Sequence, residues 1–125
     1  MNAVDSSGWL EYFADGPNAG AFLPALKDSA SIVVPAVTIY EVFKVVLRER
    51  GENEALQAVA AMQKGLVVDV SAKLAVEAAR LSHKHGLPMA DSLVLATAQA
   101  HAATIWTQDA HFRSLPAVKY FPKTK

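Results

Sequence analysis

Short apolar runs alternate with longer segments of helical periodicity along this chain. The apolar runs predict buried strands over residues 3–5, 32–34, 66–70, 103–107 and 118–120. Apolar positions recur every three or four residues in between, and they predict helices over residues 19–27, 38–50, 54–64, 72–85 and 89–102. Strands joined by helical crossovers lie parallel, so the pattern indicates an α/β domain.

Capping residues sharpen several of these boundaries. Ser6 or Ser7 is expected to cap a short helix that carries Trp9 and its aromatic neighbours, and Ser71 to cap the helix that ends before Gly86. Pro24 is expected to begin or interrupt the helix near residues 19–27.

Composition bounds the size and the chemistry of the domain. With 125 residues and 52% hydrophobic content, residues 1–125 are expected to form one domain around one core. We find no signal peptide or membrane span in the pattern, so a cytoplasmic location and no membrane partner are expected. Cysteine is absent, which leaves oxygen and imidazole as metal ligands. Twelve basic and twelve acidic residues balance, so a polyanion would need a local basic cluster.

Four acids fall near one predicted edge of the sheet. Asp5 ends the first strand, and Asp109 lies just beyond the fourth. Glu41 lies in the first turn of the helix after strand two, and Asp91 in the first turn of the helix before strand four. The carboxyl ends of parallel strands share one side of the sheet, where open α/β sheets bind ligands. These acids are therefore candidates for a single cleft.

Each acid also has a local explanation. Thr38 and Glu41 match a capping box, Asp91 complements a helix dipole, Asp5 could cap the first helix, and Asp109 suits a turn. The local explanations do not say why the acids recur at one edge. Nor do they say why Asp91 leads the most apolar helix, where an ionised carboxylate needs a cation or several donors.

Four short segments resemble one known family. They are VDSSGWLEYF, PAVTIYEV, LPMADSLVLATA and TIWTQDAHF, and in this order they are similar to the PIN-domain ribonucleases, more narrowly the VapC-type toxins of toxin–antitoxin pairs. The resemblance covers nearly the whole chain. It implies a three-layer α/β/α sandwich with a mostly parallel five-stranded sheet.

The resemblance also implies a site. The family's acidic quartet falls on Asp5, Glu41, Asp91 and Asp109, which would act as catalytic residues and ligands of Mg²⁺ or Mn²⁺. Crowded carboxylates need a counter-charge, and a divalent cation supplies one while activating water for phosphodiester hydrolysis. Asp5, Asp91 and Asp109 are expected to contact metal directly or through water, and Glu41 to share in coordination or to orient water.

Further expectations concern hydroxyls, substrate and partners. Ser6 and Thr107 match the family's small hydroxyl residues, which hold the carboxylates or touch substrate. The resemblance implies an RNA substrate, a VapB-like antitoxin and a homodimer. Lys44 and Arg48 follow Glu41 on one helical face, where they either contact RNA or form a solvated face with a Glu41–Lys44 pair.

The remaining residues give weaker signals. His111 follows Asp109, but packing is the expected role, and the other histidines are expected at helix surfaces or ends. The large apolar residues of 9–26 could belong to the core or to a groove that binds a partner, and the sequence does not assign them to one or the other.

Two alternative functions are compatible with parts of the sequence. One is a receiver-like phospho-accepting domain built on Asp69, Thr107 and Lys119, although its acidic pair after the first strand is missing. The other is a PIN fold without activity that binds partners.

Overall fold

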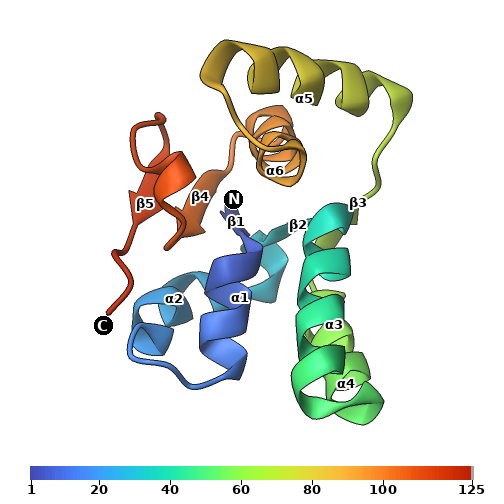
Figure 1. The fold of residues 1–125 in the computed structure, drawn as a ribbon, viewed down its shortest axis with the longest axis vertical. Coiled ribbons are helices and arrows are strands. Elements are labelled where there is room, and N and C mark those ends of the chain that lie inside the picture. Colours follow the sequence, from blue (N-terminus) through green and yellow to red (C-terminus); the bar gives the residue numbers. More distant parts are fainter. Residues whose placement is uncertain (125) are drawn as a thin grey trace.

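The computed structural model describes residues 1–124 as parallel strands alternating with helices (Figure 1). The strands are β1 (Asn2–Val4), β2 (Val33–Pro35), β3 (Leu66–Val68), β4 (Thr104–Thr107) and β5 (Val118–Tyr120). The helices are α1 (Ser6–Phe13), α2 (Ala19–Leu26), α3 (Ala36–Arg50), α4 (Glu52–Met62), α5 (Ala72–His85) and α6 (Met89–Ala100). Two 3₁₀ turns span Ser29–Ser31 and Ala110–Phe112. Every element predicted from the sequence is present, in the predicted order.

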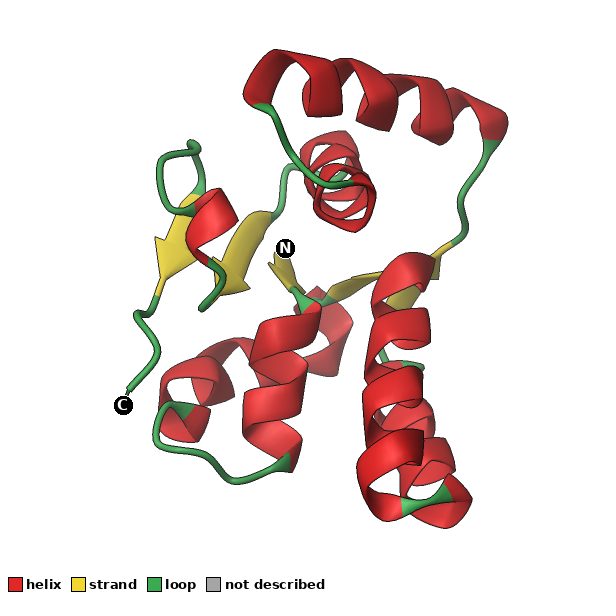
Figure 2. Ribbon diagram, viewed as in Figure 1, coloured by secondary structure: helices red, strands yellow, loops and turns green. Residues whose placement is uncertain are grey.

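The strands form two parallel groups that lie between two layers of helices. β4 pairs with β1 and β5 in one group, and β2 pairs with β3 in the other. A single parallel bridge between Asn2 and Ile32 joins them, so the five strands of the expected sheet are divided into three and two. Helices α5 and α6 cover one face, and α1 to α4 cover the other, as Figure 2 shows. The three-layer α/β/α arrangement is confirmed.

The alternation of side chains along each strand builds a core on each face. Ala3, Val33 and Ile105 point toward α6, where they pack with Val94 and Leu95. The neighbouring positions Val4, Val34 and Trp106 point to the opposite face, where they join a cluster with residues of α1 to α4. Because both faces are covered, the strands read as continuous apolar runs in the sequence.

Some helix boundaries agree with the sequence and others differ. Ser71 caps α5 through a 3.1 Å bond from the Leu74 amide, and Gly86 ends it in the left-handed conformation, as predicted. Neither Ser6 nor Ser7 caps α1. Asp5, the other cap that the sequence offered, accepts the bond from the Gly8 amide.

The other two differences concern α2 and α3. Pro24 lies inside α2 without interrupting it, and the carbonyl of Gly20 that loses its partner is on an exposed residue. Helix α3 begins at Ala36 and not at Thr38, so the capping box does not form and the buried Thr38 hydroxyl has no hydrogen-bond partner among the described residues.

Helix α6 is enclosed by the domain. Ser92 and the run Val94–Ala98 are buried, which explains why this helix is apolar on all sides. Within residues 1–124, no helix is both long and apolar enough to cross a membrane.

Candidate active site

The four predicted acids come together at the carboxyl edge of β1 and β4. Asp5 directly follows β1, Asp109 follows β4, and Asp91 lies in the first turn of α6. Glu41 lies in the second turn of α3, one turn later than predicted, because the helix begins at Ala36. The charge of Asp109 raises the pKa of each of the other three carboxyl groups, so Asp109 is the common neighbour of the group.

Asp5 is the most enclosed of the acids. Its side chain is only 4% exposed, and burial raises the pKa of the carboxyl group to about 6. Ser7 Oγ donates a 2.7 Å bond and the Gly8 amide a 3.2 Å bond to Oδ1, and Thr107 Oγ donates a 2.8 Å bond to Oδ2. These donors lower the pKa, but by less than burial raises it. Asp5 is thus a helix cap and a member of the acidic group at once.

Two hydroxyls hold the edge together. Thr107 is fully buried, so it has no surface for substrate, and its Oγ also accepts a 2.8 Å bond from the Asp109 amide. Ser7 bonds Asp5 and accepts a 3.1 Å bond from the Gln108 amide, which ties α1 to the segment after β4. The sequence predicted Ser7 only as a possible helix cap. Its place two residues after an acid that ends a strand was the signal available.

Glu41 points into the same region from α3. Partial burial is the main cause that raises the pKa of its carboxyl group, and Asp91 and Asp109 raise it further. The Ser6 side chain acts against these effects by hydrogen bonding to the ionised form. Since the capping box with Thr38 is absent, the local explanation of Glu41 no longer holds.

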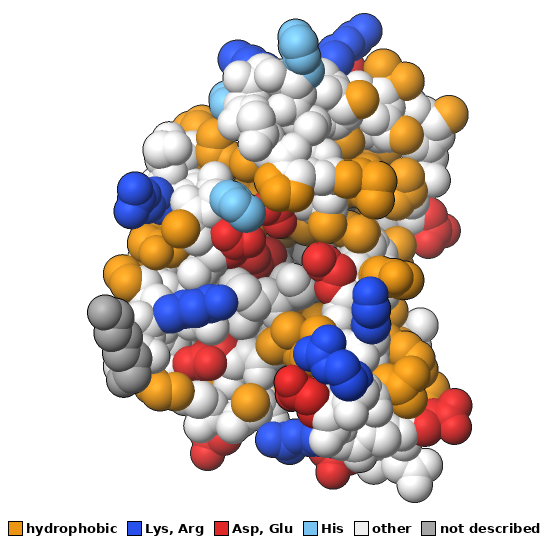
Figure 3. Space-filling view, in the orientation of Figure 1, with side chains coloured by type: hydrophobic (Ala, Val, Ile, Leu, Met, Phe, Trp, Pro, Cys, Tyr) orange, Lys and Arg blue, Asp and Glu red, His pale blue; other side chains and the backbone are white. Residues whose placement is uncertain are grey.

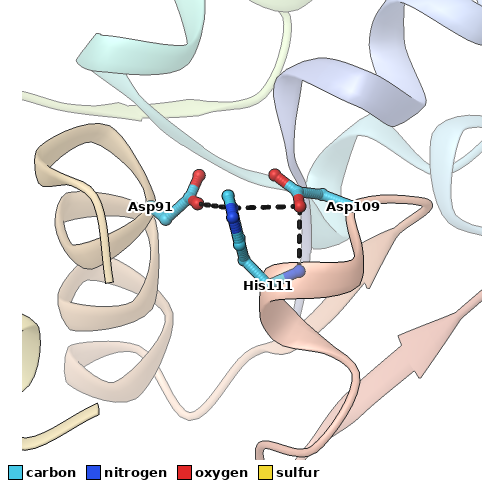
Figure 4. Close-up of side chains that lie close together, drawn as sticks. All are labelled: Asp91, Asp109 and His111. Carbon is cyan, nitrogen blue, oxygen red and sulfur yellow. Dashed lines mark hydrogen bonds and ion pairs between the residues drawn. The ribbon is translucent and has the colours of Figure 1, made fainter. Parts of the chain in front are cut away.

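The expected packing role of His111 is wrong. Its side chain is 57% exposed, and Nδ1 lies 2.8 Å from Asp91 Oδ2 and 3.2 Å from Asp109 Oδ1 (Figure 4). Asp109 Oδ1 accepts a 2.9 Å bond from the His111 amide, which caps the 3₁₀ turn and brings the ring back over the acids. The hydrogen bond to Asp91 is the main cause that raises the pKa of His111. Burial is the main cause that raises the pKa of Asp91, whereas the hydrogen bond and the charge of His111 lower it.

The arrangement suits a divalent cation. The ligand atoms of Asp91, Asp109 and His111 lie within 4.8 Å of one another, while Asp5 and Glu41 stand outside this set within the described residues. Carboxylate and imidazole donors are ligands that divalent metals accept, and a cation would offset the repulsion that raises the carboxyl pKa values. Figure 3 shows acidic side chains gathered beneath a histidine near the middle of the face, with basic side chains spread around them. The residues present therefore fit a metal ion.

The basic residues near Glu41 make other contacts. Lys44 Nζ lies 5.8 Å from the centre of the Tyr40 ring, and Arg48 lies 3.5 Å from Glu49. The alternative Glu41–Lys44 pair does not occur among the ion pairs of residues 1–124. Both side chains are exposed, so a polyanion could reach them.

The apolar residues of 9–26 divide between core and surface. Trp9 and Phe22 are buried, and Tyr12 and Leu23 are 39% and 47% exposed. A groove of about 890 Å³ runs between α1 and the pair α3 and α4, with Leu10, Phe13, Val46 and Ala58 among its lining residues. It also reaches Ser6, Ser7 and Gln108, next to the acidic group.

The receiver-like arrangement does not form. Lys119 Nζ lies 4.4 Å over the centre of the Trp106 ring, and Thr107 is bonded to Asp5. Asp69 lines a separate pocket of about 420 Å³ together with residues of α5 and α6. The three residues proposed for that alternative thus serve other parts of the fold.

Comparison with known proteins identifies the family. The family model of the PIN domain matches residues 3–118. The chain belongs to the PIN-domain family. No curated protein matches this chain.

Solved PIN-like structures share its fold at low identity. A toxin–antitoxin complex from Klebsiella pneumoniae is 20% identical, with a TM-score of 0.83 over 98% of this chain and 100% of that chain. The toxin VapC20 from Mycobacterium tuberculosis, described as cleaving the sarcin–ricin loop, is also 20% identical, with a TM-score of 0.78 over 93% and 95%. VapBC2 from Rickettsia felis, bound to a promoter DNA fragment, is 16% identical, with a TM-score of 0.71 over 97% of each chain.

Proposed function

We propose that this PIN-domain protein is a metal-dependent endoribonuclease that uses Mg²⁺ or Mn²⁺, and that it is the toxin of a VapBC-like toxin–antitoxin pair. The observation that carries the proposal is the meeting of Asp5, Glu41, Asp91 and Asp109 from four separate parts of the chain at one edge of the sheet. Three of these carboxyl groups have raised pKa values through burial and mutual repulsion. Perturbed acids that converge in this way are typical of catalytic sites.

The four acids have different proposed roles in the site. Asp91 and Asp109 offer carboxylate oxygens to a cation, and Glu41 lies where it can share in coordination or orient a water molecule. Asp5 is held by Ser7 and Thr107, so its carboxylate contributes fixed negative charge from within the fold. A bound cation would offset the charge of the scissile phosphodiester and activate water for attack on phosphorus.

Partner binding belongs to the groove between α1 and the pair α3 and α4. Several structures with this fold are toxin–antitoxin complexes, which supports a VapB-like antitoxin as the partner of this chain. An amphipathic segment could bury apolar groups against Leu10 and Phe13 while its end approaches the acids through Ser6 and Ser7. We expect Phe13→Glu, once circular dichroism has shown that it is folded, to abolish complex formation in size-exclusion chromatography with light scattering. The mass of the wild type alone in the same experiment tests the further proposal that the chain forms a homodimer.

Cleavage of a labelled RNA pool tests the activity. Wild type, Asp91→Asn and the control Asp69→Asn are compared with Mg²⁺, with Mn²⁺ and with chelator, after circular dichroism has shown that all are folded. Asp69 is an exposed acid outside the site, so its variant should cleave as the wild type does. We expect metal-dependent cleavage that Asp91→Asn loses. Equal cleavage by Asp91→Asn would overturn the assignment of the site, and antitoxin binding without cleavage by any variant would favour the inactive alternative.

A further inference from the structure

The position of His111 is fixed by the turn that carries it. The turn Ala110–Phe112 follows β4, and Phe112 is fully buried in the core beneath α6. The Asp109 side chain accepts a hydrogen bond from the His111 amide, which fixes the backbone of the residue that carries the imidazole. The exposed imidazole lies between the two carboxylates, as Figure 4 shows.

The spacing of the three side chains matches that of ligands around one ion. In octahedral coordination with bonds of about 2.1 Å, neighbouring ligands lie about 3.0 Å apart and opposite ligands about 4.2 Å apart. His111 Nδ1 is 2.8 Å from Asp91 Oδ2 and 3.2 Å from Asp109 Oδ1. All three ligand atoms lie within 4.8 Å of one another. Modest side-chain movement would therefore place the ring nitrogen and both oxygens around a cation.

We propose that His111 is a third ligand of the cation held by Asp91 and Asp109, and that its imidazole makes this site prefer transition metals to Mg²⁺. The proposal rests on the cation site of the proposed function and adds a ligand and a selectivity to it. Mg²⁺ favours oxygen ligands and keeps much of its water, whereas affinity for nitrogen donors rises from Mn²⁺ to Co²⁺. An acidic site with one imidazole should thus bind Co²⁺ more tightly than Mn²⁺, and Mn²⁺ more tightly than Mg²⁺.

A purely structural role for His111 makes a different prediction. In that case the ring only donates a hydrogen bond that holds Asp91 near Asp109. The side-chain amide of asparagine places an N–H group where histidine has Nδ1, but that nitrogen cannot ligate a metal as imidazole does. His111→Asn therefore keeps the donor and removes the nitrogen ligand.

Calorimetric titration with Co²⁺, Mn²⁺ and Mg²⁺ separates the two roles. The proteins compared are the wild type, His111→Ala, His111→Asn and the control His85→Ala. His85 is exposed and lies in the last turn of α5. We expect both His111 variants to lose about tenfold or more in Co²⁺ affinity, to lose less for Mn²⁺, and to change Mg²⁺ affinity by less than about threefold. The visible spectrum of bound Co²⁺ should also change in both variants, and His85→Ala should match the wild type.

Other results would contradict the role of His111 as a ligand or the metal selectivity. Unchanged Co²⁺ affinity in His111→Ala, or affinity restored by His111→Asn, would overturn the ligand role of His111. An equal loss for Mg²⁺ and Co²⁺ would overturn the selectivity. Asp91→Asn keeps the proposed function distinguishable: if it abolishes metal binding while His111→Ala does not, the acidic cation site stands and only the inference about His111 fails. Absence of divalent binding by the wild type would remove both.

Discussion

The Thr107 hydroxyl donates a 2.8 Å hydrogen bond to Asp5 Oδ2 across the paired ends of β4 and β1. The same oxygen accepts a 2.8 Å bond from the Asp109 amide. One fully buried side chain therefore fixes two of the four acids relative to each other. Its donor also favours the ionised form of Asp5 against the effect of burial.

Replacing Thr107 by valine should damage both stability and activity. Thr107→Val keeps the shape of the side chain but leaves Asp5 Oδ2 and the Asp109 amide without this partner, at a cost of about 1–3 kcal/mol in the free energy of unfolding. The pKa of Asp5 should rise further, which moves the acidic limb of the pH–rate profile to higher pH. Denaturant unfolding and the profile measure these effects. Thr107→Ser keeps the hydroxyl and should be much milder, whereas equal effects of the two variants would contradict the hydrogen-bonding role.

The metal-free protein should lose stability as pH rises toward neutrality. The pKa of Asp5 is raised from 3.8 to about 6, so the folded state holds its proton more tightly than the unfolded state. The stabilisation is complete below the unfolded pKa and is lost as pH rises through about 6, a change of about 3 kcal/mol. Glu41, Asp91 and His111 also have raised pKa values and act in the same direction, His111 above its ordinary pKa of 6.5.

Melting curves in chelator test this dependence. We expect a higher Tm at about pH 5 than at about pH 7.5 for the wild type, and a smaller difference for Asp5→Asn. Asparagine retains the ability to cap α1 but carries no charge, so its variant should be the more stable protein at neutral pH. A wild-type Tm that rises with pH over this range would show that the buried carboxyl group is not destabilising.

Divalent cations should reverse the loss at neutral pH. A cation that binds only the folded state stabilises it by about 2.7 kcal/mol at a hundred times its Kd. Addition of Mn²⁺ at about pH 7.5 should therefore raise the Tm of the wild type, with a weaker effect at about pH 5, where protons compete for the carboxylates. Asp109→Asn removes an open ligand at the centre of the acidic group and should not respond. Asp69→Asn serves as the control, and a response by Asp109→Asn equal to that of wild type would place the cation elsewhere.

The sequence pattern predicted the parallel strands and the shared edge of the acids, whereas the three-layer arrangement came from the resemblance to the PIN-domain family. Buried parallel strands require continuous apolar runs, and the carboxyl ends of such strands share an edge, so Asp5 and Asp109 could be placed together from topology alone. The starts of helices were harder. The amide partner of Asp5 and the early start of α3 at Ala36 depend on how the chain leaves each strand, which capping rules describe only in part.

The contacts that Ser7 and His111 make across the fold were not predicted from the sequence. Ser7 meets Gln108 and Thr107 across about a hundred positions of sequence, and these contacts exist only after β1 and β4 have paired. His111 returns over the acids because the 3₁₀ turn, capped by Asp109, reverses its direction. Such contacts depend on tertiary geometry, for which periodicity carries no signal.

Two glycine variants should have opposite effects on stability. A Cβ at Gly8 would lie 2.6 Å from Val4 Cγ1 and 2.7 Å from Phe22 Cε1, because α1 packs closely on β1 and α2 beside Asp5. Gly8→Ala should therefore cost about 1–3 kcal/mol in the free energy of unfolding. Gly20, in the exposed part of α2, has no atom within 4 Å of such a Cβ, so Gly20→Ala should stabilise by about 0.5–1 kcal/mol. Denaturant unfolding compares them, and a tolerated Gly8→Ala would show that α1 can move away from β1.

Lys44 and Arg48 should contribute to RNA binding through phosphate contacts. The Arg48–Glu49 pair is exposed on both sides, so it contributes little and leaves Arg48 available to a phosphate. Binding is measured on an Asp91→Asn background to prevent cleavage, with Lys44→Ala and Arg48→Ala combined and with Lys73→Ala and Arg80→Ala on α5 as the matched pair. Each lost phosphate contact should lower the slope of log affinity against log salt by about 0.7, so the first pair should lower it by about 1.4 and the second should not. Equal slopes for both pairs would mean that Lys44 and Arg48 form a solvated face and that RNA approaches the acids from another side.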